Sequence, residues 1–276
     1  MWRTRVKLLA PLRRQTSVWF DTELRFSELR ERQDLPRAAL DNYEGLAELW
    51  EGYAGNSQPD YTAFLSCLAQ SSGLALRSVL DVACGAGGLA ARLARIVPEV
   101  VGVDASEPML TQARNRCAKL PGVSFVLGDF RRFQLHRRFD AAVCSSNSLN
   151  YVSDINDLRA VFSCVREHLN PGGLFVCDTI TEVGMKWLSG KIIHSEQEGQ
   201  RLAILFSYDP DRRLETARLL LAAGVETHYR IPIDRRDVET ASCGSGLVLR
   251  DWFTNASLLS RRRRGLQIFC VLQHDG

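Results

Sequence analysis

The sequence lacks a long uninterrupted run of apolar residues and a strong excess of charge of either sign. No apolar stretch in its 276 residues approaches the roughly 20 residues that a membrane-spanning helix requires. The 35 Lys and Arg side chains nearly balance the 32 Asp and Glu side chains, for a formal net charge of +3. Such a small excess does not by itself indicate a polyanionic partner. We therefore expect no membrane association, a small-molecule substrate and no nucleic-acid partner.

Cysteine pairs and histidine clusters of the kinds that hold metals are also missing. The eight cysteines are scattered and never form C-x-x-C. Several, such as Cys144 and Cys177, lie within apolar segments, where a thiol behaves as a small buried hydrophobic group. This usage is typical of reduced thiols and predicts a cytoplasmic protein. The five histidines have no ligand-like spacing such as H-x-x-x-H, so the sequence predicts no metal.

What the sequence does contain is a glycine turn between an apolar segment and a helix-like segment. The run VLDVACGAGGLA starts at Val79 and continues into Ala-Arg-Leu. Gly85 and Gly87 suit a turn whose backbone takes positive φ or approaches a ligand too closely to allow a Cβ. Asp104 ends the next apolar segment, where a nucleotide-binding βαβ unit places a carboxylate for ribose hydroxyls. A nucleotide-like cofactor is therefore expected across this turn.

Two classes of nucleotide fit such a turn. Residues 85–90 loosely match G-x-G-x-x-A, which holds a dinucleotide pyrophosphate at a helix N-terminus, so an NAD-dependent oxidoreductase is one alternative. Asp81 argues against it, because a carboxylate just before the loop repels phosphate oxygens and attracts ammonium or sulfonium groups. S-adenosylmethionine carries both cationic groups and no phosphate.

The chain from Val79 onward alternates between strand-like and helix-like segments. Strands are expected near residues 79–83, 100–103, 124–127, 141–144 and 174–177. This alternation predicts an α/β fold with a parallel, Rossmann-like sheet and helices on both faces. Ligands of such sheets gather at the carboxyl ends of the strands.

Five segments in order resemble class I S-adenosylmethionine-dependent methyltransferases of the small-molecule type, including glycine N-methyltransferase and bacterial N-methyltransferases. They are LDVACGAG (80–87), VGVDASEPML (101–110), VLGDF (126–130), FDAAVCSSNSLNYV (139–152) and LNPGGLFVCDT (169–179). The resemblance implies a seven-stranded, mostly parallel sheet with an antiparallel final strand. It also implies S-adenosylmethionine as cofactor, S-adenosylhomocysteine as product, and a small antiparallel β flap over the acceptor pocket.

The same resemblance implies roles for individual residues. Asp81 is expected to face the methionine amino group, Asp104 the ribose hydroxyls and Asp129 the adenine amino group, while Met109 packs on the adenine or in the helix core. The full set of expected cofactor-binding residues is Trp50, Tyr61, Asp81, Ala83, Gly85, Gly87, Asp104, Ala105, Met109, Gly128, Asp129, Phe130, Cys144 and Ser145. Trp50 and Tyr61 either cover the cofactor or serve only in packing.

The acceptor is expected beyond the fourth strand, at Asn150 and Tyr151. His228 and Tyr229 on the flap are further candidates for positioning it, and by strand periodicity they lie on opposite faces. The sequence contains neither the Asp/Asn-Pro-Pro-Tyr/Phe tetrapeptide nor the Pro-Cys pair of nucleic-acid base methyltransferases. The expected reaction is direct in-line displacement onto a small molecule. Since no clear general base is present, an amine nitrogen is favoured over a hydroxyl.

These features divide the chain into four expected regions. They are a basic, helical N-terminal extension (1–42), the cofactor-binding core (43–181), the β flap (182–234), and the last helix with a terminal β-hairpin (235–276). The extension is expected to dock on the core or on a second subunit, which leaves a homodimer open. Arg261–Arg264 leaves open an RNA-associated or noncatalytic methyltransferase-like module, although arginines without interleaved aromatic residues favour a solvated loop.

Overall fold

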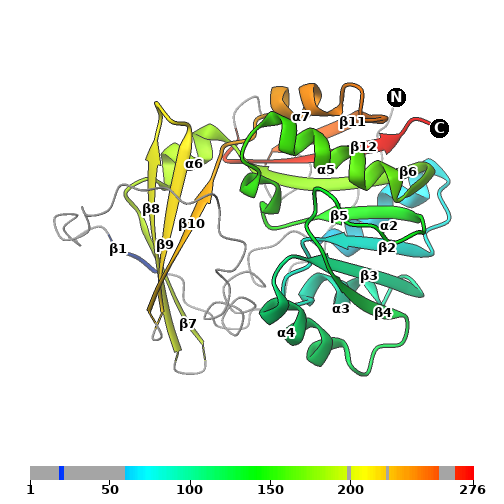
Figure 1. The fold of residues 1–276 in the computed structure, drawn as a ribbon, viewed down its shortest axis with the longest axis horizontal. Helices are drawn as coiled ribbons and strands as arrows, with labels where there is room; N and C mark the ends of the chain where they lie inside the picture. Colours follow the sequence, from blue (N-terminus) through cyan, green and yellow to red (C-terminus); the bar gives the residue numbers. More distant parts are fainter. Residues whose placement is uncertain (1–18, 22–59, 198–199, 222–223, 255–264) are drawn as a thin grey trace.

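The computed structural model describes residues 19–21, 60–197, 200–221, 224–254 and 265–276. These residues form a large seven-stranded sheet with helices on both faces and a smaller five-stranded sheet beside it (Figure 1).

The large sheet has the strand order β11-β12-β6-β5-β2-β3-β4. The strands β2 to β6 pair in parallel, whereas β12 runs antiparallel to both of its neighbours. This confirms the expected Rossmann-like sheet with an antiparallel final strand. The strand bounds are β2 Ser78–Val82, β3 Glu99–Asp104, β4 Val123–Leu127, β5 Phe139–Cys144, β6 Leu169–Ile180, β11 Leu247–Thr254 and β12 Gln267–His274.

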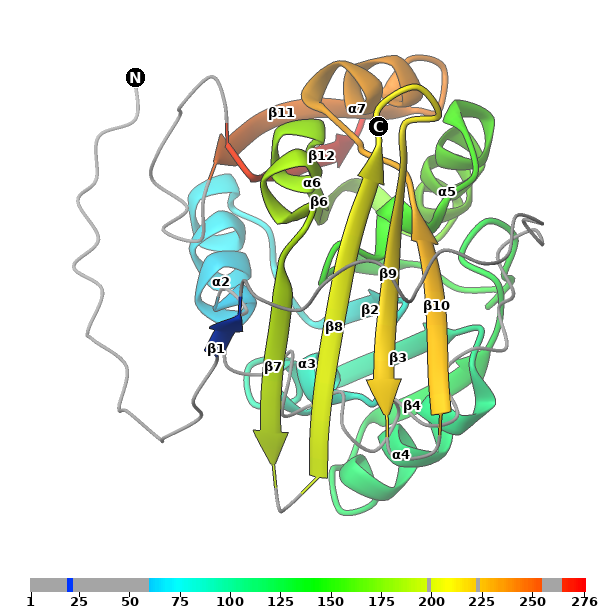
Figure 2. The ribbon, with the colours of Figure 1, turned by 90° about the vertical axis from the view of Figure 1, so that its left-hand side faces the viewer.

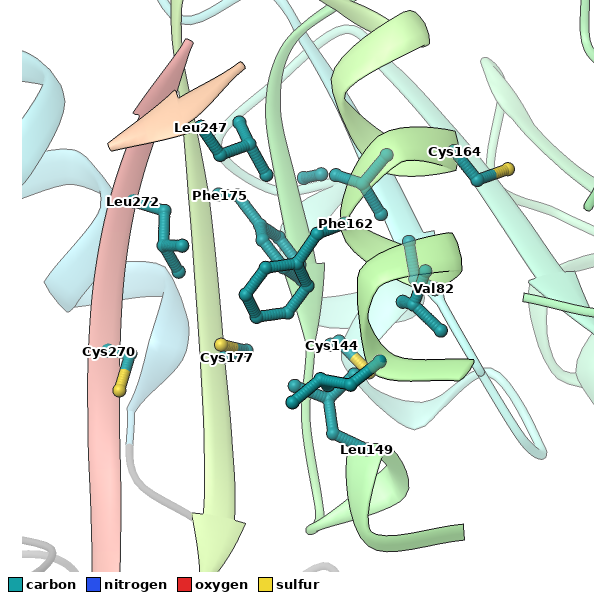
Figure 3. Packing of buried hydrophobic residues seen from close by; sticks show 14 of the residues in the cluster. Val82, Cys144, Leu149, Phe162, Cys164, Phe175, Cys177, Leu247, Cys270 and Leu272 are labelled. Atoms are coloured by element: carbon teal, nitrogen blue, oxygen red, sulfur yellow. The ribbon is translucent and has the colours of Figure 1, made fainter. Parts of the chain in front are cut away.

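Helices cover both faces of this sheet because its central strands are apolar on both sides. On one face α5 presents Phe162, which packs edge-on against Phe175 of β6 with ring centroids 5.8 Å apart (Figure 3). On the other face Leu65 of α2 and Leu93 of α3 are fully buried. The helix bounds are α2 Tyr61–Ser72, α3 Gly88–Leu93, α4 Glu107–Cys117, α5 Ile155–Glu167, α6 Glu182–Leu188 and α7 Arg235–Ser242, with a short 3-10 helix η2 at Ser148–Tyr151.

The smaller sheet is antiparallel throughout, in the order β1-β7-β8-β9-β10. Its strands β7 to β10 lie between α6 and α7 in the chain, whereas β1 comes from the N-terminal region. Figure 2 shows it face on, in front of the large sheet. It confirms the small antiparallel sheet expected at this place in the chain. The bounds are β1 Trp19–Asp21, β7 Ile192–Gln197, β8 Gln200–Asp209, β9 Leu214–Leu221 and β10 Gly224–Arg230.

Strand β1 corrects the expectation of a helix for its part of the N-terminal extension. Residues 19–21 pair antiparallel with β7, from Trp19 opposite His194 to Asp21 opposite Ile192. The outer edge of β7 offers backbone hydrogen-bonding groups, and aromatic residues such as Trp19 and Phe20 favour strands. The rest of residues 1–42, Trp50 and Arg261–Arg264 lie outside the described residues.

The helices of the described residues include none that is long and apolar enough to cross a membrane. All eight cysteines are present as thiols, and six of them are buried. Burial raises the pKa of the Cys144 thiol well above its ordinary value. These cysteines therefore act as small apolar residues of the core, as Figure 3 shows for Cys144 and Cys177.

Candidate functional site

The turn between β2 and α3 is left-handed at three of its residues. Ala83, Gly85 and Gly87 have φ values of 56°, 51° and 75°. A positive φ at a residue with a Cβ is strained, and such strain is concentrated at functional sites. The amide of Cys84 donates to the carbonyl of Val103 at 3.0 Å, which ties the turn to the end of β3.

Gly87 also lies where α4 and β4 approach the turn most closely. A Cβ on Gly87 would come within 2.9 Å of the Ala113 Cβ and 3.1 Å of the Phe125 ring. Both distances are shorter than ordinary carbon contacts. The glycine is therefore required by packing as well as by its backbone conformation.

Gly87→Ala is expected to destabilise the protein more than Gly73→Ala. Gly73 has nearly the same φ, 67° against 75°, but a Cβ there meets nothing within 4 Å. Both variants carry the cost of a left-handed alanine, about 1–2 kcal/mol, and only Gly87→Ala adds crowding of roughly 1–3 kcal/mol. Chemical denaturation of the two variants measures the difference. Equal losses of stability would contradict the crowding argument.

Asp81, near the carboxyl end of β2, is the most unusual carboxylate of the site. Its residue is 1% exposed, and neither carboxylate oxygen has a hydrogen-bond partner among the described residues. Burial raises its pKa to about 7. Since an unpartnered buried carboxylate is costly, this arrangement fits a cationic group that arrives with a ligand.

Asp104 holds the turn and the following helix together from the end of β3. Its Oδ2 accepts from the amide of Gly85 at 2.8 Å and its Oδ1 accepts from the amide of Ser106 at 2.9 Å. Burial raises the pKa of Asp104, while these two backbone hydrogen bonds oppose the rise. Each carboxylate oxygen has a second lone pair, so the geometry fits two further donors such as vicinal hydroxyls.

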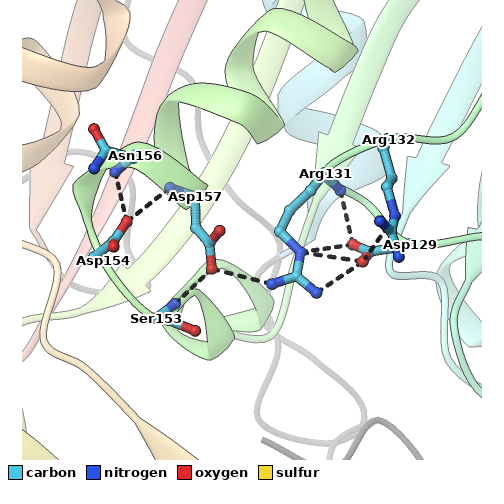
Figure 4. Close-up of polar contacts among 7 residues, drawn as sticks. All are labelled: Asp129, Arg131, Arg132, Ser153, Asp154, Asn156 and Asp157. Atoms are coloured by element: carbon cyan, nitrogen blue, oxygen red, sulfur yellow. Dashed lines mark hydrogen bonds and ion pairs between the residues drawn. The ribbon is translucent and has the colours of Figure 1, made fainter. Parts of the chain in front are cut away.

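In the loop after β4, Asp129 forms an ion pair that the sequence did not predict. Its carboxylate is held by Arg131, with Nη2 at 2.7 Å from Oδ2 and Nε at 2.9 Å from Oδ1 (Figure 4). Arg131 also reaches Asp157 of α5 at 3.0 Å. Although burial opposes it, the contacts with Arg131 lower the pKa of Asp129. Asp129 therefore forms an ion pair with the arginine two residues later, which folds back onto it, and its contact with adenine stays a prediction.

Other expected cofactor residues lie nearby. The amide of Gly128 donates to the carbonyl of Asp104 at 2.9 Å, which joins the ends of β3 and β4. Met109 is buried on the inner side of α4, whereas Ala105 and Phe130 are half-buried. Their contacts with a cofactor stay predictions.

Tyr61 packs in the core, which is one of the two roles expected for it. It is the first residue of α2, is 1% exposed, and packs its ring 6.5 Å from that of Phe269. Its hydroxyl lies near the Asp178 carboxylate without completing a hydrogen bond. The ring is therefore part of the core packing, and a contact with the cofactor stays a prediction.

The end of β5 turns sharply through two left-handed residues. Ser146 and Asn147 have φ values of 63° and 59°, directly after Cys144 and Ser145, which are both buried. Asp178 of β6 accepts from the amide of Asn147 at 2.7 Å and so braces the turn. Sequence reasoning missed Asp178, although an acid at the end of an apolar strand is the same signal that identified Asp104.

Asn150 has a structural role instead of the expected acceptor contact. Its side chain is fully buried, and Nδ2 donates to the carbonyls of Ile180 and Ile231 at 2.9 and 2.7 Å. Its Oδ1 accepts from the amide of Ile180 at 2.9 Å. The amide group therefore joins η2 to the end of β6 and to the segment after β10, and no donor is left for a substrate.

Tyr151 and His228, which are 77 residues apart in the sequence, lie in contact. The Tyr151 hydroxyl is 3.0 Å from His228 Nδ1, and the two rings meet edge to face at 5.8 Å. Burial, with a smaller effect from the charge of Arg230, lowers the pKa of His228 to about 4. Tyr229, the other candidate of β10, lies on the opposite face of the strand and is not brought to Tyr151.

Residues 79–173 match the family described as a methyltransferase domain. A dTDP-3-amino-3,4,6-trideoxy-alpha-D-glucopyranose N,N-dimethyltransferase of Streptomyces venezuelae is 36% identical over 46% of this chain and 53% of its own length. A dTDP-3-amino-3,6-dideoxy-alpha-D-glucopyranose N,N-dimethyltransferase of Streptomyces fradiae is 28% identical over 75% and 85%. The chain thus spans about half the length of the first of these curated relatives.

Solved structures share the fold across most of the chain. An S-adenosylmethionine-dependent methyltransferase from Clostridium acetobutylicum superimposes with a TM-score of 0.74 at 20% identity, covering 85% of this chain and 99% of that one. An amino pentose methyltransferase from Micromonospora echinaspora, solved with S-adenosylmethionine, has a TM-score of 0.61 at 22% identity, covering 88% and 100%. At these identities the likeness concerns the fold alone.

Proposed function

From the match of residues 79–173 to the methyltransferase-domain family, we propose that the protein is an S-adenosylmethionine-dependent methyltransferase and that it methylates an amine nitrogen of a small molecule. The observation that carries the proposal is Asp81. A buried carboxylate with no hydrogen-bond partner among the described residues suits a ligand with an ammonium and a sulfonium group and does not suit a pyrophosphate.

In the proposed site, residues of the chain bind and orient S-adenosylmethionine. Asp81 pairs with the ammonium group, Asp104 accepts from the ribose hydroxyls, and the turn at Gly85 and Gly87 allows close approach. When bound, S-adenosylmethionine supplies an activated methyl group for direct displacement by a nucleophile. The protein then has to align the acceptor and exclude water, and such positioning supplies about 7–11 kcal/mol in favourable systems.

The small sheet brings His228 to Tyr151 on a face that is otherwise a buried apolar cluster. Its face toward η2 presents the apolar side chains Leu202, Ile204, Phe206, Ala217 and Leu219. His228 lies on the same face, directly opposite Ala217. The printed names of both relatives above specify dTDP-linked amino sugars, and we infer that this chain takes an amino sugar as well.

Two assays test the proposal. Isothermal titration calorimetry is expected to show micromolar binding of S-adenosylhomocysteine and none of NAD. Mass spectrometry after incubation with S-adenosylmethionine is expected to show one or two added methyl groups on a dTDP-linked amino sugar and none on the matched sugar with a hydroxyl in place of the amine. Binding of NAD alone, or methylation of the hydroxyl sugar, would contradict it.

A further inference from the structure

Three polar side chains, Glu226, His228 and Tyr151, connect β10 of the small sheet to η2. Glu226 and His228 lie two residues apart on β10 and therefore on the same face of the strand. His228 Nε2 is 3.5 Å from Glu226 Oε2, and on the other side of the ring Nδ1 is 3.0 Å from the Tyr151 hydroxyl. All three side chains are buried or half-buried between the small sheet and η2.

The surroundings of His228 determine whether its imidazole is charged. Arg230 lies on the same face of β10 and forms an ion pair with the fully buried Glu215 opposite it, with Nε 2.7 Å from Oε2. Burial and the nearby guanidinium disfavour a charged imidazole and lower the pKa of His228. A neutral imidazole has one N–H donor and one acceptor nitrogen.

Glu226 decides which nitrogen carries the proton. A carboxylate only accepts hydrogen bonds, and it is attracted to an N–H and repelled by a nitrogen lone pair. At 3.5 Å the carboxylate oxygen and Nε2 do not form a hydrogen bond, but the attraction of the carboxylate for an N–H favours the tautomer protonated at Nε2. Nδ1 is then the acceptor, and the Tyr151 hydroxyl must donate its proton to it.

We propose that Glu226 and His228 together fix the direction of the Tyr151 hydroxyl, so that its oxygen serves as an obligate acceptor for an N–H of the methyl acceptor. Glu226 and His228 are positioning residues, and Tyr151 is the group that touches the substrate. This inference rests on the proposed function and narrows it. A hydroxyl that accepts an N–H orients the nitrogen lone pair away from itself, and it selects primary and secondary amines over ethers and tertiary amines.

The tautomer of His228 tests the proposal without an acceptor. Long-range ¹H–¹⁵N spectra of the full chain, labelled at histidine, are expected to show His228 neutral at pH 7 and protonated at Nε2, with His228→Gln identifying its resonance. Glu226→Gln is expected to shift population toward the Nδ1-protonated form, because an amide can also donate. Glu239→Gln, at an exposed ion pair with Arg235, is the control and is expected to leave the tautomer unchanged.

A wild-type His228 that is protonated at Nδ1, or charged at pH 7, would overturn the proposal whatever the protein catalyses. With a dTDP-linked amino sugar as probe, Tyr151→Phe and Glu226→Gln are expected to lower kcat about tenfold, the equivalent of one hydrogen bond. Both variants are expected to bind S-adenosylhomocysteine like the wild type. Absence of S-adenosylhomocysteine binding by the wild type would instead count against the proposed function and leave the tautomer result intact. Unchanged kcat in both variants, with the sugar methylated by the wild type, would also overturn the inference.

Discussion

Asp81→Asn is expected to lose at least 100-fold in affinity for S-adenosylmethionine and yet to raise the stability of the unliganded protein at pH 8. The loss arises because the amide cannot pair with the ammonium group of the ligand. The gain arises because the folded protein at pH 8 holds a buried carboxylate with no hydrogen-bond partner among the described residues. The neutral amide removes the cost of burying that charge.

The sign of the stability effect follows from proton linkage. Burial raises the pKa of Asp81 from 3.8 to about 7, so between about pH 4 and pH 7 the folded state binds more protons than the unfolded state. Stability therefore falls as the pH rises through this window, and the full cost remains above pH 7. At about 1.4 kcal/mol per pKa unit, the cost is at most about 4 kcal/mol. Thermal unfolding of both proteins at pH 5 and pH 8 measures it, and the variant's advantage is expected to be clearly larger at pH 8 than at pH 5.

Asp140→Asn is the matched control for this experiment. Asp140 lies at the start of β5, at the other end of the same sheet, and accepts from the amides of Arg77 and Ser78 at 2.9 and 3.0 Å and from Asn170 Nδ2 at 2.9 Å. Although burial opposes it, these hydrogen bonds lower the pKa of Asp140. Asp140→Asn should therefore destabilise the protein without changing affinity. An Asp81→Asn variant that unfolds more readily and binds normally would contradict the role given to Asp81.

Asp104→Ala is expected to abolish detectable binding of S-adenosylhomocysteine. The substitution removes the acceptor for the ribose hydroxyls and also the brace between Gly85 and Ser106. Charge-assisted hydrogen bonds are worth roughly 1.5–3 kcal/mol each, so two of them amount to more than a 100-fold change in affinity. Calorimetric titration of the variant measures the loss.

Asp154→Ala separates loss of the ligand contact from general loss of stability. Asp154 caps α5 by accepting from the amides of Asn156 and Asp157 at 2.7 and 2.9 Å, much as Asp104 accepts two backbone amides. Its removal is expected to cost about 1 kcal/mol of stability and to leave affinity intact. If Asp154→Ala weakened binding as much as Asp104→Ala, the effect of Asp104 would be attributable to folding alone.

The sequence predicted those features that depend on local chain geometry. The glycine turn after β2 and the acid at the end of β3 follow from residues close together in the chain, and the structure places Asp104 on the amide of Gly85. The parallel pairing of β2 to β6 followed from the alternation of apolar segments and helices. Such local features can be predicted because each turn requires particular backbone conformations, which only certain residues adopt.

Features that depend on distant partners were not predictable in the same way. The strand at residues 19–21 exists through its pairing with β7, and Tyr151 meets His228 only because β10 crosses in front of η2. The ion pair between Asp129 and Arg131 was also not predicted from the sequence. Glu226 escaped notice although it shares the period-two face of His228.

The central claim is that the edge formed by β2 and β3 holds a positively charged nucleoside, and proton release on binding tests it most directly. Titration of S-adenosylmethionine at pH 6.5, in buffers of different ionisation enthalpy, counts the protons exchanged. With the pKa of Asp81 raised to about 7, pairing with the ammonium group is expected to release roughly three quarters of a proton, and Asp81→Asn to release none. Binding with no proton release, or no binding at all by a folded protein, would contradict the claim.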